Sequence, residues 1–213
     1  DETIGQKASG WTRWPGGWPE EISTSLIDAV FSARATYETK HGKGVLPLVR
    51  CWRDANGKAV NDLALLAKQI SEVGPATWAT RFGSSQHSPG RRTEDPGGPT
   101  KAAAVLEAAE KLTAQGVRSA DHISDETAAA VKATLREVRG VGYATVNYFL
   151  ILLGRPGVKP DRMIHRFITE ATGKAFSDAE AEQLVTQVAG TLGVASHVLE
   201  HAMWSYESAK ASR

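Results

Sequence analysis

Apolar residues recur along most of the chain with the spacing of amphipathic helices. Capping residues, glycines and prolines divide this pattern into segments, because they favour helix ends over helix interiors. The segments predicted as helices are 26–31, 63–70, 78–82, 102–112, 125–138, 143–152, 162–172, 178–192 and 196–208. Strand-like alternation is absent, and residues 83–99 are rich in Gly, Pro and Ser, which predicts a loop. The predicted fold class is therefore all-α.

Composition is typical of a globular protein, with 41% hydrophobic and 23% charged residues among 213. Cys51 is the one cysteine, which excludes a disulfide scaffold, an iron–sulfur cluster and a cysteine-rich zinc site. The longest apolar run, Tyr148–Leu153, is too short to cross a bilayer. We expect a monomer without a membrane partner, located in the cytoplasm.

The net charge is only +1, but positive charge is concentrated between residues 132 and 166. Such patterning is most often a solvated helix face. Within the patch, however, the sequence Arg139-Gly-Val-Gly-Tyr143 joins two apolar helices. Gly-x-Gly permits positive φ, so that N–H groups at the start of the next helix can bind a phosphate without reading a base. Val141 is expected to point into the core.

Residues 135–147 (LREVRGVGYATVN) resemble the helix-hairpin-helix of the endonuclease III-like (HhH-GPD) DNA glycosylases. Residues 158–166 (VKPDRMIHR) are similar to the family segment that carries an essential aspartate, which falls on Asp161. Residues 26–36 and 100–105 resemble two further family helices. The four pieces occur in the family's order and together span about residues 20–170.

This resemblance implies two helical lobes with a DNA-binding cleft between them. Residues 16–154 would form a six-helix barrel lobe with the helix-hairpin-helix at about 135–153, and residues 1–15 plus 155–213 the second lobe. The implied activity is hydrolysis of the N-glycosidic bond of a damaged or modified base in double-stranded DNA, as in base excision repair. The base must first be flipped out of the stack. Asp161 would stabilise the oxocarbenium-like state and activate water, although its position also suits a helix N-cap.

Departures from the family pattern narrow the expected chemistry. Lyase-competent members carry a lysine where this chain has Ala144, so a monofunctional enzyme without a Schiff base is expected. Arg34 replaces a family glutamine. The sequence does not identify the base that is excised, although alkylated purines are slightly favoured. His197 and His201 lie one helical turn apart but lack the His-Glu-x-x-His pattern, so no metal site is expected. No organic cofactor is implied, whereas relatives often bind a monovalent cation through hairpin carbonyls.

Two groups of further residues follow from the resemblance and the basic patch. The DNA-binding candidates are Arg139, Gly140, Val141, Gly142, Tyr143, Ala144, Thr145, Lys159, Arg162 and Arg166. The candidates for the base pocket or for the wedge that fills the gap in the duplex are Arg34, Tyr37, Trp52 and His165, although aromatic residues in an all-α protein are mostly core. Two alternatives remain: a helix-hairpin-helix protein that binds DNA structure without catalysis, and a small-molecule hydrolase on an all-α scaffold.

Overall fold

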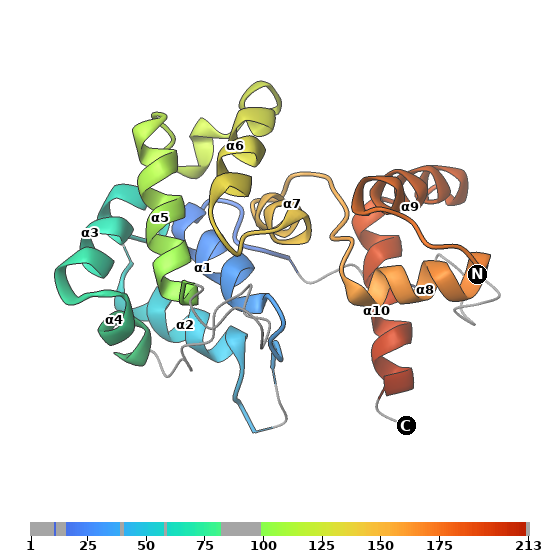
Figure 1. Cartoon of the computed structure of the whole chain (residues 1–213), viewed down its shortest axis with the longest axis horizontal. Coiled ribbons are helices and arrows are strands. Elements are labelled where there is room, and N and C mark those ends of the chain that lie inside the picture. The colour runs from blue at the N-terminus through green and yellow to red at the C-terminus, as the bar shows by residue number, and fades with distance from the viewer. Residues whose placement is uncertain (1–10, 12–15, 39–40, 58, 82–98, 212–213) are drawn as a thin grey trace. The chain divides into compact units, whose positions relative to one another are not determined.

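The computed structural model describes residues 11, 16–38, 41–57, 59–81 and 99–211 of the 213-residue chain. All regular elements in these ranges are helices, so the all-α prediction is confirmed for the described part of the chain. Contacts divide the chain into two compact units, and Figure 1 shows the helices of one in blue to yellow and the helices of the other in orange to red. The larger unit is Trp18–Leu153, and the smaller unit comprises Asp1–Gly17 and Gly154–Arg213. The sequence-based boundaries were placed after residues 15 and 154.

The larger unit is built around one central helix. Residues 22–31 of α1 (Ile22–Ser32) are all buried, and α1 packs against α2, α5 and α7. The other α-helices of this unit are α2 (Val45–Ala55), α3 (Leu63–Val73), α4 (Pro75–Arg81), α5 (Lys101–Ala114), α6 (Asp125–Glu137) and α7 (Tyr143–Leu152). Two 3-10 turns, η2 (Ala59–Asn61) and η3 (Ala120–His122), lie between them.

Helix α2 was not predicted from the sequence. Its apolar positions Val45, Leu48, Val49 and Trp52 nevertheless follow helical spacing, and all four are buried. Pro47 lies in the first turn, where a missing N–H leaves no hydrogen bond broken. The periodic signal is therefore present in the sequence, and Pro47 is compatible with it.

A buried carboxylate ties both ends of α1 to the surrounding chain. Asp28 is fully buried, and its carboxylate accepts hydrogen bonds from Trp18 Nε1, Ser32 Oγ and the Tyr37 hydroxyl, each at 2.9 Å. Burial and the adjacent Asp28 carboxylate raise the pKa of Tyr37 above its usual value. Charge-assisted hydrogen bonds of this kind are needed because an unpaired buried carboxylate would be strongly destabilising.

A buried lysine caps the C-terminal end of the same helix. Lys101 Nζ donates a hydrogen bond of 2.7 Å to the main-chain carbonyl of Phe31, in the last turn of α1. Burial lowers the pKa of this amine to about 8. The interaction joins α5 to α1 and satisfies a carbonyl that helix geometry leaves without a partner.

We predict that Lys101→Met lowers the free energy of unfolding by about 1–3 kcal/mol, because the Phe31 carbonyl loses its buried partner. Lys111→Met on the same helix is the control, since Lys111 pairs with Glu137 at the surface and such pairs contribute about 0–1 kcal/mol. Urea unfolding measures both. The lowered pKa makes wild-type stability rise between about pH 8 and pH 10.5, so the loss in Lys101→Met should grow over that range. Equal losses in the two variants would contradict the capping role.

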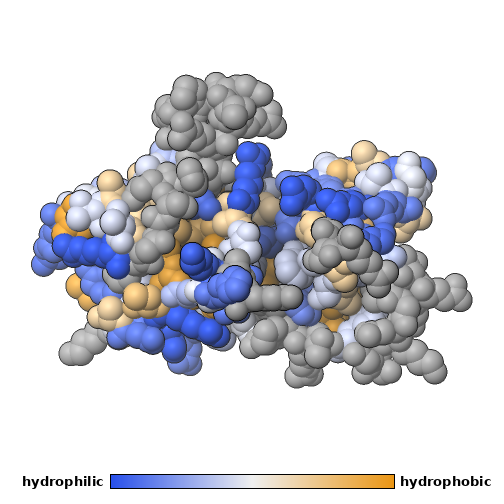
Figure 2. Space-filling model, turned by 90° about the horizontal axis from the view of Figure 1, so that it is seen from below, coloured by the Kyte–Doolittle hydropathy of each residue, from blue (hydrophilic) through white to orange (hydrophobic). Residues whose placement is uncertain are grey.

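The smaller unit contains α8 (Arg162–Thr172), α9 (Asp178–Leu192) and α10 (Ser196–Ala211). Its core is apolar, and α10 packs against both other helices. Val158, in the segment before α8, is fully buried in this core. None of the described helices has the length and apolar character of a membrane span. On the face drawn in Figure 2, hydrophilic (blue) residues are interspersed with smaller hydrophobic (orange) areas.

Candidate functional site

The turn between α6 and α7 has the geometry that its glycines predict. Gly140 adopts φ +90°, a region that L side chains rarely enter, and the N–H of Val141 donates to the Val138 carbonyl at 3.0 Å. Val141 is 5% exposed, so the expectation that it points into the core is confirmed. The buried Val141 side chain therefore holds the turn against the core of the larger unit.

The N-terminus of α7 has no side-chain cap. Its N-cap residue is Gly142, which has no side chain to accept a hydrogen bond from the first helical N–H groups. Such groups, together with the helix dipole, favour an anion. Tyr143, Ala144 and Thr145 form the first turn of α7 and are half-buried, while Gly142 and the neighbouring Arg139 are exposed.

Asp161 is the N-cap of α8 in the smaller unit. Its Oδ1 accepts hydrogen bonds from the N–H groups of Met163 at 2.8 Å and Ile164 at 3.2 Å. No described residue donates a hydrogen bond to Oδ2, and the side chain is half-buried. The cap therefore occupies one carboxylate oxygen and holds the group in a fixed orientation. The second oxygen, Oδ2, accepts no hydrogen bond from the described residues.

Residues 157–160, which precede Asp161, contact both the core of the smaller unit and α10. Val158 is fully buried, and Ser196 Oγ donates to the Gly157 carbonyl at 3.3 Å. The Asp161 N–H donates to the Lys159 carbonyl at 2.7 Å, which closes a tight turn around Pro160. Contacts on both sides thus determine where the carboxylate lies.

Glu200 on α10 is the main site residue that sequence reasoning missed. Its carboxylate accepts a hydrogen bond from the Lys159 main-chain N–H and lies within electrostatic range of Asp161. Burial, reinforced by the Asp161 charge and opposed by Lys159, raises the pKa of Glu200 to about 8. Glu200 is therefore mainly protonated at neutral pH. The only sequence signal at Glu200 is its position between His197 and His201.

The basic candidates of the smaller unit differ in their surroundings. Arg166 Nη1 lies 3.7 Å from Oε2 of Glu207, a fully buried carboxylate, so Arg166 has a clear structural role. His165 Nε2 lies 2.8 Å from Asp178 Oδ1, so the His165 ring is hydrogen-bonded to a residue of the same unit. Arg162 is exposed and Lys159 is half-buried. Arg162 is thus the most accessible cation beside Asp161 in the sequence.

The pocket and wedge candidates of the larger unit also differ. Arg34 is exposed and adopts φ +52°, a strained conformation for a non-glycine residue and one that is common at functional sites. The Tyr37 hydroxyl is held by Asp28, and its ring is half-buried. Trp52 is 0% exposed, so its ring is part of the core and could reach a base only after rearrangement.

Metal ligands do not cluster in the described part of the chain, where no group of three or more His, Cys, Asp or Glu residues could hold an ion. His201 instead stacks on Trp204, with ring centroids 6.4 Å apart. Burial lowers the pKa of His201.

Comparison with solved structures shows a shared fold. A structure of MBOgg1 in complex with a low-affinity DNA ligand matches with a TM-score of 0.53 at 13% sequence identity. The match covers 91% of this chain and 62% of that chain, so the present chain spans less than two thirds of the neighbour's length. The protein belongs to the family described as a domain of unknown function, DUF8548, which matches residues 2–208. No curated protein sequence matches it.

The raised pKa of Glu200 predicts a pH-dependent stability. A carboxyl group that titrates at about 8 when folded and near 4.5 when unfolded binds more protons in the folded state over that interval. Wild-type stability therefore falls as pH rises through it. Glu200→Gln cannot ionise and still offers an oxygen to the Lys159 N–H. Its stability relative to wild type should increase by on the order of 4 kcal/mol between about pH 5 and pH 9.

Urea unfolding across this pH range measures the effect. Glu170→Gln is the control, because Glu170 lies at the surface of the same unit and pairs with the exposed Lys210. Its pH profile should follow that of wild type. If Glu200→Gln also followed wild type, Glu200 would be ionised throughout.

Proposed function

We propose that this protein is a monofunctional DNA glycosylase that hydrolyses the N-glycosidic bond of a damaged or modified base. The observation that carries the proposal is the state of Asp161. One of its oxygens is fixed by α8, and the other accepts no hydrogen bond from a described residue. A carboxylate held in this way is suited to act on a substrate without moving.

In the proposed reaction the bond between C1′ of the deoxyribose and the base nitrogen breaks, and the base leaves with the bonding electrons. Positive charge develops on the sugar, which Asp161 Oδ2 stabilises. A water oxygen then bonds to C1′, and Asp161 orients that water and accepts its proton. The departing base is protonated by solvent. Glu200 holds the Lys159–Asp161 turn through the Lys159 N–H and so acts as a positioning residue.

DNA would be held by the turn between α6 and α7. The uncapped N-terminus of α7 offers main-chain N–H groups to a backbone phosphate, and Arg139 adds an exposed positive charge. The solved structure with a similar fold contains DNA, and the sequence resemblance to glycosylases includes this same turn. Both support the assignment of DNA as the partner.

The absence of lyase chemistry is part of the proposal. A β-elimination by the family's route needs an amine in the first turn of α7, and Ala144 occupies that position. Lys101 does have a lowered pKa, but it is buried and bonded to the Phe31 carbonyl. Strand cleavage is therefore expected only after treatment with hot alkali.

We predict that Asp161→Asn lowers base release by roughly 10²- to 10⁴-fold, because the amide cannot stabilise the sugar cation or accept a proton. Folding and DNA binding should persist, since asparagine caps a helix as well as aspartate does. The assay uses a panel of duplexes that each carry one modified base, with alkali-labile sites as the readout.

Asp62→Asn is the matched control for this variant. Asp62 caps α3 with the same geometry, accepting from Ala64 N at 2.9 Å and Leu65 N at 3.2 Å. Its base release should equal that of wild type. Undiminished release by Asp161→Asn would disprove the catalytic assignment, and cleavage without alkali would disprove the monofunctional one.

The second candidate function is a DNA-structure-binding protein without catalysis, which Ala144 and Arg34 favour because both depart from the catalytic family's pattern. It predicts salt-dependent DNA binding with no base released from any duplex of the panel. A small-molecule hydrolase would show no salt-dependent affinity for DNA.

A further inference from the structure

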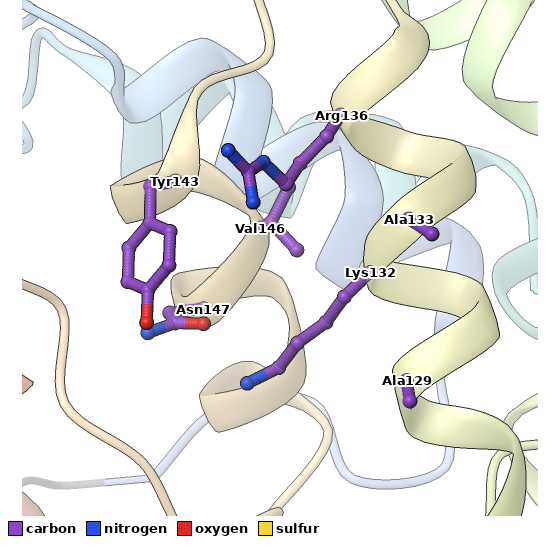
Figure 3. A pocket seen from close by; sticks show the side chains of 7 residues that line it. All are labelled: Ala129, Lys132, Ala133, Arg136, Tyr143, Val146 and Asn147. Atoms are coloured by element: carbon purple, nitrogen blue, oxygen red, sulfur yellow. The ribbon is translucent and has the colours of Figure 1, made fainter. Parts of the chain in front are cut away.

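Helices α6 and α7 enclose a pocket of about 250 Å³ beside the turn that joins them. Lys132 and Arg136 reach over it from α6, and Tyr143, Val146 and Asn147 line it from α7 (Figure 3). Two alanines of α6, one of them Ala133, leave the space open on that side. We call this space the α6–α7 pocket.

The charges of the α6–α7 pocket are unbalanced. No acidic residue lines it, and neither Lys132 nor Arg136 forms an ion pair with a described residue. Like charges one helical turn apart destabilise a helix slightly. By contrast, the neighbouring Glu137 is paired with Lys111 at 3.1 Å, away from the pocket. Two unneutralised cations over a hollow are the features of an anion site.

The pocket also offers an aromatic surface. The Arg136 guanidinium lies 5.6 Å from the centre of the Tyr143 ring, so positive charge and a π face are adjacent. A volume of 250 Å³ equals the share of about eight water molecules in the liquid, which leaves room for a flat ring such as one nucleobase. Proteins that bind single-stranded nucleic acid combine these same elements, a basic groove and an aromatic stacking surface.

We propose that the α6–α7 pocket binds one nucleotide whose base is unpaired. Its phosphate lies between Lys132 and Arg136, and its base packs against the Tyr143 ring and Val146. The inference rests on the proposed function for its choice of DNA as the polymer. It adds a site for a single-stranded or displaced nucleotide next to the turn that holds the duplex.

The test is the affinity of the full-length protein for an undamaged, fluorescein-labelled single strand of about ten thymidines, measured by anisotropy. Ala133→Phe fills the pocket from an exposed position of α6. Ala130→Phe is the matched control, because Ala130 is exposed on the same helix and does not line the pocket. The first variant should weaken binding by at least about tenfold and the control by less than about twofold. A blunt undamaged duplex should bind both variants as it binds wild type.

The remaining results separate the possible ligands. Equal affinity of wild type and Ala133→Phe for the single strand would overturn the proposal. Equal weakening of single-strand and duplex binding by Ala133→Phe would also overturn it, because the pocket would then contact only the sugar-phosphate backbone and not an unpaired base. If Ala133→Phe weakened binding of free thymidine monophosphate but not of the single strand, the ligand would be a free nucleotide and the assignment to DNA would be wrong. The probe is undamaged, so failure of base excision and failure of this site are seen in separate assays.

Discussion

Enclosure of α1 on all sides is the constraint on which the larger unit depends. Because residues 22–31 are all buried, a charged group on α1 or packed against its end needs a partner inside the protein. Asp28 and Lys101 meet this requirement by recruiting Trp18, Tyr37 and the Phe31 carbonyl. Helix α7 packs directly on α1, so the turn before α7 is joined to the buried centre of the larger unit.

In the smaller unit, one side chain combines a structural role with the chemical role that we propose. Asp161 begins α8 through one oxygen and leaves the other without a described donor. An N-cap and a reactive carboxylate are therefore compatible roles, because the cap fixes the orientation that chemistry requires. Glu200 adds a second constraint from α10 by holding the Lys159 N–H. The hydrogen bonds that cap α8 therefore also fix the orientation of the candidate site carboxylate.

Parts of the candidate site lay outside the reach of sequence reasoning for one reason: they depend on helices that are distant along the chain. Glu200 is 39 residues from Asp161, and no local pattern indicates that α10 packs against the segment before α8. The partner of Arg166 is Glu207, which is likewise remote, and Trp52 appeared as a pocket candidate until its burial was known. Helix α2 is a different case, since its apolar positions follow helical spacing and the signal is local.

The sequence by itself determined the fold class, most helix positions, the glycine turn at residues 140–142 and the cap at Asp161. These features are local, because helical periodicity, glycine φ angles and capping operate within a few residues. Only the tertiary structure decided which charges are neutralised, which aromatic rings are buried and where space remains between α6 and α7. Those properties arise when helices pack, and packing brings together residues whose separation along the chain carries no signal.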